Sequence, residues 1–130
     1  MTRKFKFEKL IRDKILDSML SNPDQNPQWK TLSDEDFIIE LKKKLLEEVH
    51  ELIKLETIDP EEIADIQEVL NYIISVSSSS KEEIEKLMKE KKEKVGGFDK
   101  RAFVGIQEIN DDSEWVDEYL KQPEKYPEII

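Results

Sequence analysis

Carboxylates recur at one spacing in the middle of the chain, in the segments EEVHE and EIAD. The first segment contains Glu47, Glu48 and Glu51, and the second contains Glu62 and Asp65. On a helix, residues three apart lie on neighbouring turns of one face, which pairs Glu48 with Glu51 and Glu62 with Asp65. Two such helices packed antiparallel would surround a cation with oxygen ligands, which suit Mg²⁺ or Mn²⁺ far better than zinc. The spacing therefore predicts a hard-cation site with open positions for water and substrate phosphates.

Apolar periodicity predicts that both acidic segments are helical. One helix is expected over about residues 33–56, beginning at a capping-box-like Ser33, and another over about 60–76, with Asp59 as N-cap and Pro60 as its first residue. The residues expected on the buried sides are Ile38, Leu41, Leu45, Val49 and Leu52, widened by Ile39, Leu46 and Ile53, in the first helix and Ile63, Ile66, Leu70 and Ile73 in the second.

Three further helices complete the expected all-α fold. They span about residues 9–20, 80–95 and a short stretch within 111–122, and the second of them ends at Gly96-Gly97, a typical helix stop. The residues expected to point inward from the helix over 80–95 are Ile84, Leu87, Met88 and Val95.

Glu62 has two interpretations. It stands at the third position of a capping box, where its side chain would accept from the backbone N–H of Asp59, and this alone would explain it. That account leaves unexplained why the facing helix also brings Glu48 and Glu51, since like charges on packed helices repel unless a cation or a proton intervenes.

Composition excludes several classes of protein. A formal net charge of −10 argues against nucleic-acid and anionic-membrane binding, which need a basic surface. The chain has no cysteine, so thiolate metal sites and cysteine nucleophiles are excluded, and no apolar run is long enough for a membrane span. A cytoplasmic location is expected. With 37% hydrophobic against 40% charged residues, some apolar helix faces are expected to be buried in a homodimer.

Four blocks in series resemble the phosphoribosyl-ATP pyrophosphohydrolase-like branch of the MazG superfamily, the all-α nucleoside triphosphate pyrophosphatases. They are KLIRDKI at 9–15, LKKKLLEEVHEL at 41–52, EEIADIQEVL at 61–70 and KKEKVGGF at 91–98. The resemblance implies a helical bundle completed by dimerisation, and hydrolysis of a nucleoside triphosphate to a monophosphate and pyrophosphate. It ends near residue 104, which divides the chain into an expected enzymatic domain, 1–104, and a C-terminal extension with a short helix, 105–130.

The resemblance also implies roles for individual residues. Glu48, Glu51, Glu62 and Asp65 would bind Mg²⁺, with Mn²⁺ as a substitute, and Glu47 would be a further acid of the cluster. Glu47 and Glu48 are the expected catalytic residues.

Basic residues at both ends of the resemblance are expected to bind the substrate phosphates, because arginine and lysine neutralise phosphate oxygens. Members of this branch commonly have an arginine before the double glycine, where this chain has Val95, and Lys94 is the nearest replacement. The expected phosphate-binding set is Arg12, Lys14, Lys91 and Lys94.

Two other functions stay open. The chain could be a true phosphoribosyl-ATP pyrophosphohydrolase of histidine biosynthesis, which keeps the chemistry and changes the substrate. Alternatively, an acidic helical dimer could be a non-enzymatic interaction module. The basic set at residues 12, 14, 91 and 94 distinguishes the classes, since a pure scaffold has no need to aim cations at an acidic cluster.

Overall fold

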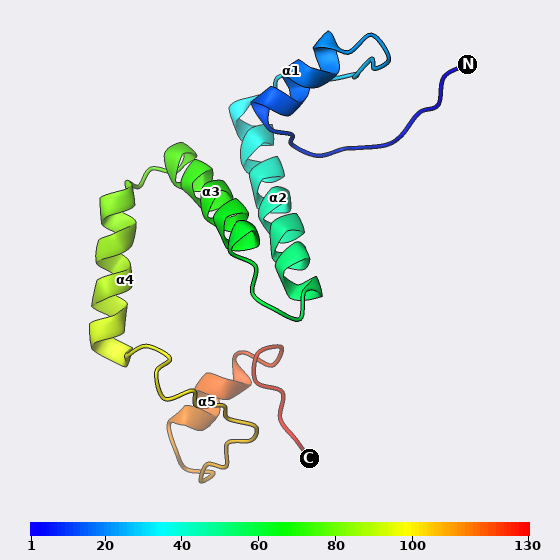
Figure 1. Cartoon of the computed structure of the whole chain (residues 1–130). Helices are drawn as coiled ribbons and strands as arrows, with labels where there is room; N and C mark the ends of the chain where they lie inside the picture. The colour runs from blue at the N-terminus through cyan, green and yellow to red at the C-terminus, as the bar shows by residue number, and fades with distance from the viewer. The chain divides into compact units, whose positions relative to one another are not determined.

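The computed structural model describes all 130 residues as α-helices joined by irregular segments, with no strand (Figure 1). The predicted all-α class is therefore confirmed. Contacts divide the chain into two units, Met1–Lys94 and Val95–Ile130. The extent of the expected enzymatic domain, residues 1–104, stays a prediction. The helices are α1 (Asp13–Ser21), α2 (Asp34–Lys54), α3 (Pro60–Val76), α4 (Lys81–Val95) and α5 (Trp115–Leu120).

Local capping sets most of the helix boundaries. The Ser33 hydroxyl accepts a hydrogen bond from the backbone N–H of Asp36 at 3.2 Å at the start of α2, and the Ser80 hydroxyl accepts one from Glu83 at 3.2 Å before α4. These contacts satisfy amide groups that a helix start leaves without partners. Gly96 follows α4 with φ +83°, a left-handed conformation that favours glycine. The predicted starts of α2 and α4 and the stop of α4 are confirmed.

The α1 helix begins later than predicted. Residues up to Arg12 are irregular, and Arg12 itself is the extended N-cap residue of α1 with no side-chain cap. The apolar spacing correctly predicts a helix here, but the basic segment before Asp13 is not helical. Lys9 and Arg12 are consequently placed on an irregular segment and not on a helix.

Helices α2 and α3 form an antiparallel pair and are the only two helices packed along their lengths (Figure 1). The connection over residues 55–59 is short, which favours an antiparallel neighbour. Leu41 of α2 and Val69 of α3 are the two buried residues of the chain. The predicted inner stripe of α2 is confirmed, since its other members are part-buried: Ile38, Leu45, Val49 and Leu52.

The predicted buried stripe of α3 is wrong at two positions. Ile63 is 48% exposed and Leu70 is 36% exposed, whereas Ile66 and Ile73 are part-buried as predicted. At about 100° per residue, Ile63 and Leu70 lie about 100–120° from Val69 on the helical wheel. The helix is thus rotated so that Val69 faces α2. This rotation turns the acids of the EIAD segment toward the α2 side.

Other predicted apolar positions are also exposed. Leu87, Met88 and Val95 of α4 do not point inward, because no helix packs along α4. On α2, the residues expected to widen the inner stripe are solvent-accessible as well: Ile39, Leu46 and Ile53. None of the five helices combines the length and the apolar composition that a membrane span requires.

Candidate functional site

Three carboxylates meet across the α2–α3 pair. Glu48 comes from α2 and Glu62 and Asp65 come from α3, and one oxygen of each lies within 4.8 Å of the other two. All three residues are part-buried. The capped start of α3 puts Glu62 and Asp65 three residues apart in its first two turns, so both project to the same side as Glu48. We call Glu48, Glu62 and Asp65 the three-acid group.

Glu62 is the member of this group without a polar partner. Its Oε2 atom is shielded from solvent and has no hydrogen bond, although the side chain as a whole is partly exposed. Desolvation raises the pKa of Glu62, and the negative charges of Asp65, Glu48, Glu51 and Asp59 raise it further. A neighbouring positive charge would favour the ionised form of this carboxyl.

The capping interpretation of Glu62 is wrong. The carboxylate of Asp59 accepts a hydrogen bond from the backbone N–H of Glu61 at 2.9 Å, so α3 is capped by Asp59. No hydrogen bond joins the Glu62 side chain to the backbone N–H of Asp59. Glu62 therefore lies at the helix interface for a reason other than capping.

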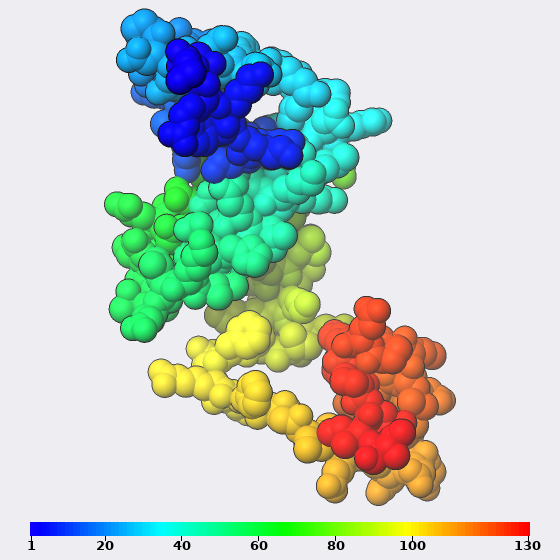
Figure 2. Space-filling model, turned by 90° about the vertical axis from the view of Figure 1, so that its right-hand side faces the viewer, coloured from blue at the N-terminus to red at the C-terminus, as the bar shows by residue number.

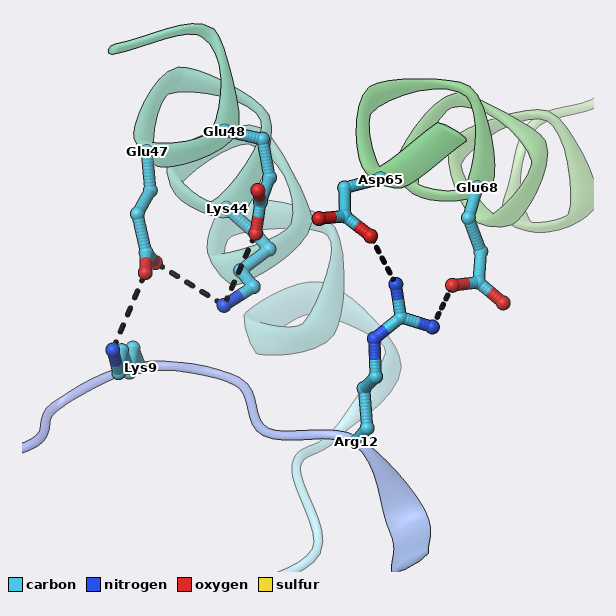
Figure 3. A network of polar contacts seen from close by, with 7 residues as sticks. All are labelled: Lys9, Arg12, Lys44, Glu47, Glu48, Asp65 and Glu68. Atoms are coloured by element: carbon cyan, nitrogen blue, oxygen red, sulfur yellow. Dashed lines mark hydrogen bonds and ion pairs between the residues drawn. The ribbon is translucent and has the colours of Figure 1, made fainter. Parts of the chain in front are cut away.

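Two lysines neutralise the α2 side of the site (Figure 3). The Lys44 Nζ atom lies 3.3 Å from Glu47 Oε2 and 3.6 Å from Glu48 Oε1, and the Lys9 Nζ atom lies 3.3 Å from Glu47 Oε1. Partial desolvation acts to raise the pKa of Glu47, but the hydrogen bonds from Lys9 and Lys44 outweigh it and lower that pKa. Glu47 is thus held ionised between two cations.

Arg12 holds the α3 side (Figure 3). Its Nη2 atom donates to Asp65 Oδ1 at 2.9 Å and its Nη1 atom donates to Glu68 Oε2. Desolvation acts to lower the pKa of Arg12, but the hydrogen bonds and charges of Glu68 and Asp65 raise it on balance. The Arg12 side chain is 58% exposed, so solvent reaches this contact. One residue of the three-acid group is therefore shared with a cation from outside the helix pair.

The charges of the site do not balance. Five carboxylates and three cations leave a formal charge of −2, which is the charge that one divalent cation would neutralise. The carboxylates are Glu47, Glu48, Glu62, Asp65 and Glu68, and the cations are Lys9, Arg12 and Lys44.

The structure brings together only part of the predicted site. Glu51 lies outside the three-acid group and forms an ion pair with Lys54 at 3.4 Å, although its charge raises the pKa of Glu62. Lys14, Lys91 and Lys94 form no ion pair, and α4, which carries the last two, does not pack along α2 or α3. The roles assigned to these four residues stay predictions.

Three residues of the site were missed by sequence reasoning. Lys44 precedes Glu47 by three residues and Glu48 by four, a helical spacing at which opposite charges meet, so the sequence contained its signal. Glu68 follows Asp65 by three residues, the spacing that puts both carboxylates on one face of a helix, so the sequence also contained its signal. Lys9 had no local signal, since its partner Glu47 is 38 residues away.

An open hollow of about 480 Å³ adjoins the Arg12 contact on the outer side of α3. Arg12, Asp65 and Glu68 line it together with Ala64, Gln67 and Asn71. The hollow is shallow and widely open to solvent, and polar and apolar atoms line it about equally. The side chain of Arg12 is therefore accessible from solvent.

Comparison with known proteins gives no relative, because no protein-family model, curated protein or solved structure matches the chain.

Proposed function

We propose that the chain is a Mg²⁺-dependent nucleoside triphosphate pyrophosphohydrolase with a MazG-like helical bundle. The observation that carries the proposal is the meeting of Glu48, Glu62 and Asp65 across the α2–α3 pair, beside a solvent-accessible arginine. Oxygen-rich carboxylate sites select hard cations, and a Mg²⁺ site commonly takes one or two carboxylates plus substrate phosphates. The resemblance of four sequence blocks to MazG-like pyrophosphatases supports the same assignment.

The residues present fit a magnesium ion. All three donors are carboxylate oxygens, and the shielded Glu62 Oε2 lacks any hydrogen-bond partner. Glu48, Glu62 and Asp65 would hold the ion, with Glu51 available one turn further along α2. When bound, Mg²⁺ would act as a Lewis acid on phosphate oxygens.

The cations around the site have a second use in this reaction. Arg12 presents a planar fork of donors suited to a phosphate group, and Lys44 carries a point charge beside Glu47 and Glu48. Neutralising the triphosphate lowers the barrier to attack by water and stabilises the leaving pyrophosphate. Glu47, which contacts Lys9 and Lys44, would accept a hydrogen bond from that water.

A product assay tests the proposal. Purified chain with Mg²⁺ is incubated with the standard and deoxy nucleoside triphosphates and with phosphoribosyl-ATP, and the products are separated by chromatography. We expect a monophosphate and pyrophosphate, lost on adding a chelator. A diphosphate with free phosphate would refute the proposal, and turnover of phosphoribosyl-ATP alone would assign the histidine-pathway reaction. No turnover of any nucleotide would favour the interaction module.

We also infer that the chain dimerises through the side of the α2–α3 pair opposite the acids. On α2, Leu46 and Ile53 lie about 80–100° to one side of Leu45 on the helical wheel, whereas Glu48 and Glu51 lie about 60–120° to the other. Leu46 is 59% exposed and Ile53 is 71% exposed. The two flanks of α2 therefore differ in chemistry.

The same division holds on α3. Ile63 and Leu70 lie about 100–120° to one side of Val69, and Asp65 and Glu68 lie about 40–100° to the other. In an antiparallel pair, residues that are rotated in the same direction from the contact face of each helix lie on the same side of the pair. The exposed apolar residues of both helices therefore form one surface. Packing that surface against its copy would make a four-helix bundle and cover side chains that a single chain leaves in water.

Leu46→Lys tests this interface, and Phe103→Lys is the matched control, because Phe103 is 93% exposed and lies in the second unit. Light scattering of wild type and of the control should give a dimer, and Leu46→Lys should give a monomer or a strongly weakened dimer. A wild-type monomer with full activity at micromolar concentration would contradict the dimer.

A further inference from the structure

The segment before α1 is attached to the helix pair at two charged points. Residues 1–8 are exposed, and Figure 2 shows the first residues of the chain on the outside of the first unit. Lys9 reaches Glu47 at 3.3 Å and Arg12 reaches Asp65 at 2.9 Å, while Leu10 and Ile11 between them are part-buried. We call residues 9–12 the N-terminal strap.

Asp65 takes part in two sets of contacts. Its Oδ1 atom accepts a hydrogen bond from Arg12, and the residue is also a member of the three-acid group. A carboxylate that coordinates a divalent cation gives up most of its charge to that ion, and the ion repels a guanidinium beside it. A divalent cation on Asp65 would therefore weaken the ion pair between Asp65 and Arg12.

We propose that the N-terminal strap regulates the metal site, with Arg12 occupying Asp65 in the metal-free protein and moving away from Asp65 when a divalent cation binds. This inference rests on the proposed metal site. Glu68 lies outside the three-acid group and also binds Arg12, so it retains the guanidinium as a pivot. Arg12 lines the open hollow of about 480 Å³, and once freed from Asp65 its donors are available to a substrate phosphate. Metal and phosphate binding would thus be coupled through one side chain.

The exposure of the contact allows such an exchange. Arg12 is 58% exposed and Asp65 is 39% exposed, and ion pairs of this kind contribute little to stability because water screens them. The competing guanidinium should accordingly weaken divalent-cation binding by only about two- to fivefold. A contact of this strength can be displaced by a cation at millimolar concentration without unfolding the site.

Arginine side-chain NMR follows the exchange directly, because the chain has only three arginines: Arg3, Arg12 and Arg101. Arg3 lies over the ring of Phe5 at 5.6 Å, and neither Arg3 nor Arg101 forms an ion pair, so both are internal references. During a Mg²⁺ titration we expect the guanidinium resonances of Arg12 to shift and to exchange faster with water, while those of Arg3 and Arg101 stay in place.

A separate measurement of metal binding distinguishes failure of the strap proposal from failure of the proposed metal site. Free Mn²⁺ is measured by EPR in solutions of wild type, Arg12→Gln and the control Arg101→Gln. Arg12→Gln should bind Mn²⁺ about two- to fivefold more tightly than wild type, and the control should match wild type. If Mn²⁺ binds but the Arg12 resonances do not respond and Arg12→Gln binds no more tightly, the strap has no regulatory role and the metal site stands. If no variant binds Mn²⁺, the metal site and the strap proposal are both wrong.

Discussion

Asp65→Asn and Glu68→Gln form a matched pair of substitutions on α3. Each removes one carboxylate charge, each preserves the shape of the side chain, and each removes one of the two partners of Arg12. Only Asp65 belongs to the three-acid group. A difference between the two variants therefore reports on the metal site and not on the ion pair.

Their effects on stability should be small and alike. The side chains of Asp65 and Glu68 are 39% and 44% exposed, so each ion pair is largely screened by water and should contribute at most about 1 kcal/mol. Arg12 keeps one carboxylate partner in either variant. Thermal unfolding followed by circular dichroism should show both proteins folded, with similar midpoints in the presence of a chelator.

Their effects on metal binding and activity should differ. Losing one of the three carboxylate ligands should lower the affinity for Mg²⁺ by about tenfold or more. Asp65→Asn should therefore raise the Mg²⁺ concentration needed for pyrophosphate release by about tenfold or more, and Glu68→Gln should stay within about fivefold of wild type. Equal responses to Mg²⁺ in the two variants would refute the assignment of Asp65 as a ligand.

Four other substitutions test the electrostatics and the phosphate contacts. Because the folded-state pKa of Glu62 is raised, its ionised form destabilises the native state at neutral pH. This destabilisation disappears as the pH falls below the ordinary pKa range of a carboxyl group. In chelator, Glu62→Gln should therefore have a higher melting temperature than wild type at neutral pH and the same melting temperature in acid. If Lys94 replaces the missing family arginine, Lys94→Ala should lower kcat/KM about 10- to 100-fold, as Arg12→Ala should, while Lys92→Ala on the same helix should be nearly silent. Equal, small effects of all three alanine substitutions would leave the lysines of α4 as a solvated helix end.

The starts of α2, α3 and α4 and the acid pairs were determined by local sequence. The caps at Ser33, Asp59 and Ser80 act over two or three residues, so the starts of α2, α3 and α4 could be predicted without knowledge of the rest of the chain. The same holds for the three-residue spacing that puts Glu62 and Asp65 on one face of α3. These features depend on backbone geometry that is the same in every helix.

Tertiary structure decided which face of α3 meets α2. Apolar residues occupy more than half of its circumference, so Ile63 and Leu70 were as plausible inward residues as Val69 from periodicity alone. Packing against α2 buries the Val69 face. That rotation brings Glu62 and Asp65 to Glu48 and leaves Glu51 outside the group.

The cations of the site show the same division. Lys44 is a helical neighbour of Glu48 and could be inferred from sequence spacing, whereas Arg12 meets Asp65 across 53 residues. A long-range ion pair depends on the path of the connecting chain and on the rotation of both partners, and neither leaves a pattern in the sequence. Local hydrogen bonding thus fixed the helices and the spacing of their acids, and only packing between segments far apart in the chain decided which charges meet.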